Sequence, residues 1–239
     1  MSPTFRLILF ICLFSVSRIS FSENKEQDHH YTDKGFFDIH VCNWPNKPLF
    51  LMGLFSTTDF NDISSVEIYT PDNISIGSLD LNKFRQFKNK KNQLKKAFIN
   101  QFNLPKKTTD GWYKATITLK NNKVIHAKDF VQHETMPLPV GTSPSNKSEN
   151  IKLPSSLHWD KIKSAKFYKI YIKDLWLDGK LIYESKLLTD NMLVLPKNLI
   201  KNGGYYSWAI HARDINEDIK LGDFNHGSLS HKMTFSVED

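Results

Sequence analysis

From Phe36 onward, apolar residues fall into short runs that are separated by turn-forming segments. The clearest run alternates apolar and polar residues from Tyr113 to Lys120, which is the period of a strand with one face on a core. Asn121–Asn122 and a second apolar run follow it, a pattern typical of a β-hairpin. Because the other runs are also rich in β-branched and aromatic residues, the sequence predicts an all-β protein.

Residues 81–103 fit two kinds of structure. Two short strands joined by a polar turn at 89–92 are one interpretation, and a helix is the other. We favour the hairpin because all neighbouring runs resemble strands. The helical alternative depends on an approximate apolar stripe, formed by Phe84, Phe87, Leu94, Phe98 and Phe102.

The composition changes in residues 136–156, which predicts a linker or an irregular first strand. Four of the ten prolines lie there beside a glycine and a run of Ser and Asn. We therefore predict two sandwich-like domains, an N-terminal β-domain over 36–135 and a second domain over 136–239. Residues 23–35 are mostly polar and aperiodic, and we interpret them as a flexible lead-in.

The C-terminal half resembles a fibronectin type III-like sandwich over about residues 152–237. In that family a tryptophan on the second strand packs into the core, and Trp159 matches it. Leu199, Gly203–Gly204 and Tyr206 match the tyrosine corner, in which a tyrosine hydroxyl bonds to upstream backbone. The resemblance implies an immunoglobulin-like fold and no particular chemistry. The whole chain also resembles uncharacterised secreted bacterial proteins.

The N-terminus has the features of a cleaved signal peptide over residues 1–22. Arg6 precedes a ten-residue apolar run, Leu7–Val16, and Ser20 and Ser22 are the small residues that a signal peptidase site needs. The run is too short to span a bilayer, and we expect no transmembrane segment in the mature chain. We therefore expect an exported protein, either periplasmic or secreted.

Signal removal would leave a single cysteine, Cys42, which lies in a strand-like run. We interpret Cys42 as a buried core residue, since free cysteine is usually buried. The alternatives are a nucleophile or an intermolecular disulfide.

The positive charge is concentrated in one segment. The chain has 32 basic and 25 acidic residues, yet Lys83–Lys107 contains nine basic residues and no acid. Such a segment attracts anions, and in an exported protein these would be an anionic glycan, a lipid headgroup or an envelope protein, with no role for nucleic acid. The alternative is a solvated strand or helix face. The candidate binding residues here are Lys88, Lys90, Lys91, Lys95 and Lys96.

Two further places are candidates for binding. Trp176 lies beside a turn, where it could stack on a sugar or anchor a partner, or cover the edge of its own core. Residues 211–231 are rich in His, Asp and Asn, and within them Asp223 and His226 are candidates for a recognition loop. The alternatives are a solvated loop, or a metal or catalytic site, although the spacing matches no metal motif. We expect no metal and no cofactor.

No phosphate loop, HExxH, CxxC pair or G-x-S-x-G stands in the sequence, and we assign no catalytic residue. The favoured function is a non-catalytic binding or adaptor protein of the cell envelope or exterior. One alternative is a metal-dependent or hydrolytic enzyme that uses loop 211–231. The other is a structural module of a surface assembly.

Overall fold

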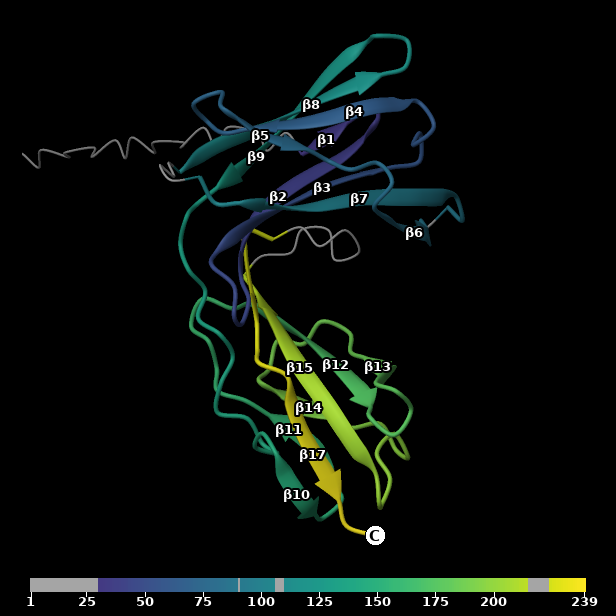
Figure 1. Cartoon of the computed structure of the whole chain (residues 1–239), viewed down its shortest axis with the longest axis vertical. Helices are drawn as coiled ribbons and strands as arrows, with labels where there is room; N and C mark the ends of the chain where they lie inside the picture. The colour runs from purple at the N-terminus through teal and green to yellow at the C-terminus, as the bar shows by residue number, and fades with distance from the viewer. Residues whose placement is uncertain (1–29, 90, 106–109, 215–223) are drawn as a thin grey trace, which may run out of the picture.

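The computed structural model describes residues 30–89, 91–105, 110–214 and 224–239, and every regular element in them is a β-strand (Figure 1). The all-β prediction is confirmed for this part of the chain. Within the same ranges, no helix is long and apolar enough to cross a lipid bilayer. The strands of the first half are β1 (Tyr31–Thr32), β2 (Gly35–Asn43), β3 (Phe50–Thr57), β4 (Ile63–Tyr69), β5 (Ser75–Ser78), β6 (Phe84–Lys88), β7 (Leu94–Asn103), β8 (Gly111–Leu119) and β9 (Val124–Val131).

Two sheets of the N-terminal half enclose one core. Strands β2, β3, β7 and β6 are neighbours in one sheet, and β5, β4, β8 and β9 form the other, as the two layers at the top of Figure 1 show. Apolar side chains from both layers meet between them, because alternate residues of each strand face inward. The largest of these buried side chains include Phe37, Phe55, Tyr113 and Ile117.

Both hairpins expected from the sequence are present. β8 pairs antiparallel with β9, and Asn122 turns the chain with a φ of 64°, a conformation that asparagine adopts more readily than most residues. β6 pairs antiparallel with β7, and Asn92 has a φ of 61° in the intervening turn. The hairpin interpretation of residues 81–103 is confirmed, and the helical alternative is wrong.

Residues 30–35 are ordered, which corrects the expectation of a flexible lead-in over 23–35. β1 pairs with the start of β2, and the Thr32 hydroxyl accepts a hydrogen bond from the Gly35 amide at 3.0 Å. His30 is buried, and its ring stacks on Phe36 with 5.4 Å between the centroids. These contacts attach the segment to the sheet. Residues 23–29 and the expected signal peptide 1–22 lie outside the described residues.

A second group of buried apolar side chains fills the C-terminal half. Trp159 lies in it, with its ring centroid 5.3 Å from that of Tyr168 and 6.4 Å from that of Trp208, so its expected place in the core is confirmed. Segment 136–156 contributes a strand that pairs parallel with the last one. The strands of this half are β10 (Ser148–Ile151), β11 (Ser156–His158), β12 (Phe167–Asp174), β13 (Lys180–Glu184), β14 (Met192–Val194), β15 (Tyr205–Arg213), β16 (His226–Leu229) and β17 (Met233–Val237).

Tyr206 has the geometry of a tyrosine corner, as the family resemblance implied. Its side chain is 2% exposed, and its hydroxyl accepts a hydrogen bond from the backbone amide of Lys201 at 3.0 Å. A Cβ atom at Gly204 would lie 2.3 Å from that hydroxyl oxygen, so only glycine leaves room for the ring. The expected roles of Tyr206 and Gly204 are confirmed.

Strand β16 joins the two halves into one sheet. It pairs antiparallel with β15 and parallel with β2, where Gly227 lies opposite Cys42. In the described residues the strands from β10 through β2 to β6 therefore form one continuous sheet, although the two cores are separate. Cys42 is 1% exposed on this path, and its interpretation as a buried residue is confirmed.

Candidate binding surfaces

The basic segment forms the outer edge of the large sheet. β6 is the last strand in the sheet order, and among the described residues it pairs with β7 alone. Arg85, Lys88 and Lys91 are exposed, and no carboxylate of the described chain lies within ion-pair distance of them. Charge on this edge is therefore open to solvent. Lys90 lies outside the described residues.

Lys95 and Lys96 are half-buried, unlike the three exposed cations. The Lys96 ammonium lies 3.9 Å from the centroid of the Phe84 ring and 4.5 Å from that of Phe60. A cation over two aromatic faces is attracted by both ring quadrupoles. Lys96 therefore contributes to the packing of its own sheet as well as to the charge of the segment.

The hairpin presents its charge on two faces. Arg85 lies opposite Ala97 in the register, whereas Lys88 lies opposite Leu94. Because side chains alternate along a strand and paired residues share a face, Arg85 and Lys88 point to opposite sides of the sheet. Phe98 lies on the same side of the sheet as Lys88, and its side chain is buried in the N-terminal core. The side that carries Arg85 is the outer one.

A groove of about 370 Å³ lies beside Arg85 on the outer side of the sheet. Sequence reasoning missed it, because Trp44 follows β2 and reaches Arg85 only through the pairings β2–β3, β3–β7 and β7–β6. No local pattern in the sequence links residues across three strand pairings. The residues that line the groove are Trp44, Met52, Lys83, Phe84, Arg85, Ile99 and Gln101.

Trp176 lies far from the hairpin, in the turn between β12 and β13 of the lower half of Figure 1. Its side chain is 70% exposed, yet the indole nitrogen donates a hydrogen bond to the carbonyl of Gly203 at 3.1 Å. The Trp176 ring also packs against the Tyr205 ring, with 5.7 Å between the two centroids. Trp176 is thus an exposed aromatic side chain that its neighbours hold in place, and it shares no surface with the basic hairpin.

His226 is buried at the junction of the two halves. Its Nδ1 lies 2.7 Å from a carboxylate oxygen of Asp214, and its Nε2 lies 2.7 Å from the backbone carbonyl oxygen of Gln132. Burial lowers the pKa of His226, but the Asp214 carboxylate and the Gln132 carbonyl more than offset it, so the pKa is raised above 6.5. An imidazole with an acceptor at each nitrogen is fully bonded only when protonated. The protonated form of His226 therefore links β16 to Asp214 through Nδ1 and to the residue that follows β9 through Nε2.

The rest of segment 211–231 also makes internal contacts where it is described. Nδ1 of His211 lies 3.3 Å from a guanidinium nitrogen of Arg213. The guanidinium carbon of Arg213 lies 4.8 Å from the centroid of the Phe224 ring. Burial, with Arg213 nearby, holds the pKa of His211 well below 6.5, so its ring is neutral. In the described ranges, no group of three or more His, Cys, Asp and Glu side chains is placed to hold a metal ion. Asp223 lies outside these ranges.

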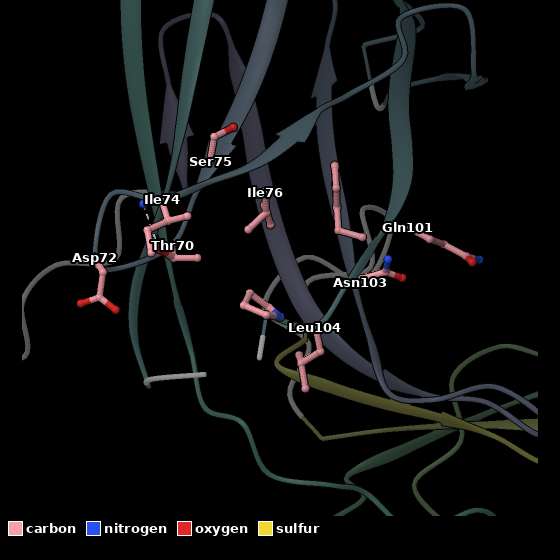
Figure 2. A pocket seen from close by; sticks show the side chains of 10 residues that line it. Thr70, Asp72, Ile74, Ser75, Ile76, Gln101, Asn103 and Leu104 are labelled. Carbon is pink, nitrogen blue, oxygen red and sulfur yellow. Dashed lines mark hydrogen bonds between the residues drawn. The ribbon is translucent and has the colours of Figure 1, made fainter. Parts of the chain in front are cut away.

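A pocket of about 500 Å³ opens between the β4–β5 turn and the end of β7 (Figure 2). Ile76 and Leu104 lie near its centre, and Gln101 extends away from it. That direction agrees with the register, which places Gln101 on the outer side of the sheet with Ile99. No basic side chain is among the described residues that line this pocket, and it shares only Gln101 with the lining of the groove beside Arg85.

No protein-family profile and no curated protein match this chain. Among solved structures, it is similar to SGBP-B of the Bacteroides ovatus mixed-linkage glucan utilization locus, in complex with a mixed-linkage heptasaccharide (TM-score 0.23, 9% identity, 82% of this chain and 42% of that one). It is also similar to dimeric latent PorU from Porphyromonas gingivalis (TM-score 0.29, 11% identity, 87% and 20%) and to murine CEACAM1b (TM-score 0.24, 11% identity, 84% and 99%). The chain thus spans less than half the length of the first two. At these TM-scores the similarities carry no functional argument.

Proposed function

We propose that this chain is an exported, non-catalytic binding or adaptor protein that holds an anionic partner on the β6–β7 hairpin. The observation that carries the proposal is the exposure of Arg85, Lys88 and Lys91 at the edge of the sheet. In the described chain no acidic side chain neutralises them. Clustered cations of this kind raise the local concentration of anions and their rate of association.

The class of partner follows from the compartment. The apolar run Leu7–Val16 and the small residues Ser20 and Ser22 support export, to the periplasm or to the exterior. The anions of that environment are acidic glycans, lipid headgroups and the acidic faces of envelope proteins, whereas nucleic acid is not expected there.

The other candidate residues have different places in this proposal. Trp176 suits the anchoring of a partner, because it is exposed and its orientation is fixed, but it would form a separate contact. His226 uses both ring nitrogens inside the protein, which supports a structural role for it instead of a binding role. The proposal therefore rests on the hairpin alone.

The test compares two variants of the mature protein with equal changes in charge. In the first, Arg85, Lys88 and Lys91 are changed to Gln. In the second, the same change is made at three exposed lysines of the C-terminal half, Lys161, Lys163 and Lys166. Retention on acidic polysaccharide and on anionic vesicles is measured at rising salt, which screens exposed charges beyond about 8 Å at physiological strength.

We expect the hairpin variant to lose retention and its salt dependence, while the C-terminal variant keeps most of both. Equal losses would show that net charge alone is responsible and that the hairpin is not a site. Absence of retention of the unaltered protein on every anionic surface would also contradict the proposal.

A further inference from the structure

The groove beside Arg85 combines three kinds of surface within one small space. Trp44 is aromatic, and Met52 and Ile99 are aliphatic, whereas the Phe84 ring lies with Phe98 on the other side of the sheet. Its polar part consists of the Gln101 amide with two cations, Lys83 and Arg85. A concave site that is largely apolar and has a few converging polar groups is the usual form of a small-ligand site, and about 370 Å³ is sufficient for one or two sugar rings.

Of the cations at this groove, Arg85 is the one available to a ligand. The Lys83 ammonium lies 3.6 Å from a carboxylate oxygen of Asp80, which already offsets part of its charge. Lys47 lies at the rim, where its ammonium donates to the Gln101 side chain at 3.3 Å and lies 5.3 Å from the centroid of the Trp44 ring. Arg85 has no such partner in the described residues, and its planar guanidinium fits a carboxylate with two parallel hydrogen bonds.

We infer that this groove binds a carboxylate-bearing sugar residue of an acidic saccharide, with the carboxylate on Arg85. A sugar ring has a flat face of C–H groups, which suits the aromatic and aliphatic lining, and hydroxyls, which suit the Gln101 amide. An acidic peptide supplies carboxylates but not a rigid apolar ring beside each one. The inference rests on the proposed function, because it names the ligand class and the place of recognition within the basic edge.

The experiment uses the two faces of β6. Arg85→Gln removes the cation at the groove, and Lys88→Gln removes an exposed cation three residues away on the opposite face of the same strand. The two changes alter net charge equally, so long-range attraction falls by the same amount in both. Each mature variant is titrated with an oligogalacturonate in a calorimeter at low salt, and its thermal unfolding is recorded to show that it is folded.

We expect Arg85→Gln to weaken binding about tenfold, as the loss of a charge-assisted hydrogen-bonded pair does. Lys88→Gln removes the same charge from the basic edge but no contact in the groove, so it should also weaken binding, by only about two- to threefold. A second variant, Gln101→Leu, keeps the charge and removes the amide, and it should also weaken binding. Equal effects of Arg85→Gln and Lys88→Gln would overturn the inference but leave the proposed function standing.

A neutral oligosaccharide and polyglutamate test whether the groove recognises both the carboxylate and the sugar ring. A neutral oligosaccharide of equal length should bind at least about tenfold more weakly than the oligogalacturonate, because it lacks the carboxylate for Arg85. Polyglutamate that binds as tightly, with the same dependence on Arg85, would overturn the assignment to a saccharide. Retention on anionic vesicles without any oligogalacturonate binding would do so as well. Absence of binding to every anion would instead contradict the proposed function.

Discussion

The tyrosine corner offers a sharp test of the C-terminal half. Tyr206→Phe removes one hydroxyl and leaves the ring in place between its neighbours. In the structure that hydroxyl accepts a hydrogen bond from the backbone amide of Lys201 at 3.0 Å. Lys201 lies five residues upstream, where the chain turns into β15. The substitution therefore leaves the Lys201 N–H without its acceptor in a partly buried place.

The expected loss is small and can be measured. A single neutral hydrogen bond contributes about 1 kcal/mol to stability, and an amide left unpaired can add to that loss. For a chain of this size, 1 kcal/mol corresponds to a decrease in Tm of about 2–4 °C. Gly204→Ala should destabilise more, by about 1–3 kcal/mol, because its Cβ would lie 2.3 Å from the hydroxyl oxygen and force the Tyr206 ring to move.

Urea denaturation gives the measurement, with the midpoint read at an unchanged m-value. The matched control is Tyr205→Phe, since the Tyr205 side chain is half-buried and its hydroxyl has no hydrogen bond in the described chain. That change should shift stability by less than about 0.5 kcal/mol. An unaltered midpoint for Tyr206→Phe, or equal shifts for the two variants, would refute this account of the corner.

Three other outcomes are expected. Lys96→Gln should lower stability by about 0.5–1 kcal/mol through its lost cation–π contacts, and Lys91→Gln should leave it nearly unchanged in the same melting experiment. Gly227→Ala should lower Tm, because a Cβ there would lie 2.6 Å from the Phe224 ring; an unchanged Tm would show that the junction adjusts freely. The folded-state pKa of His226 is raised, so its stabilisation is complete below pH 6.5 and is lost as pH rises through that raised value. Denaturation midpoints against pH should show this decline, and His226→Gln should remove it.

Sequence reasoning succeeded where the controlling interactions are local. The alternation from Tyr113 to Leu119 identified β8, because each second residue there faces the N-terminal core. The family resemblance placed Gly204 and Tyr206 in a tyrosine corner, and this motif can be matched along the sequence because the glycine and the ring that lies against it are two residues apart. In both cases the physical cause lies within one strand or one turn, so a pattern in the sequence reports it directly.

The same reasoning left residues 81–103 open because their apolar stripe mixes two faces. Phe84 and Phe98 lie opposite each other on one side of the hairpin, whereas Phe87 lies opposite Lys95 on the other side. A helical stripe and two amphipathic strands can produce the same spacing of phenylalanines over so short a segment. The choice between a helix and a hairpin depends on which strands the segment pairs with, and the tertiary structure determines that pairing.

The groove could not be predicted for a related reason. Trp44, Arg85 and Gln101 meet because β2, β3, β7 and β6 pair in that order, which no single segment encodes. The sequence did identify the charge of the segment, since composition alone shows it. It could not show that Lys96 lies over aromatic rings, or that Arg85 and Lys88 face opposite ways.

The parallel pairing of β16 with β2 also decides how this protein can be divided. A fragment that ends after β9 would keep β2 but lose the strand beside it, and the complementary fragment would keep β16 without β2. Each piece would then carry an open strand edge, which is a template for pairing between molecules. We therefore expect either half alone to self-associate, and dissection of this protein requires that both strands stay on one polypeptide.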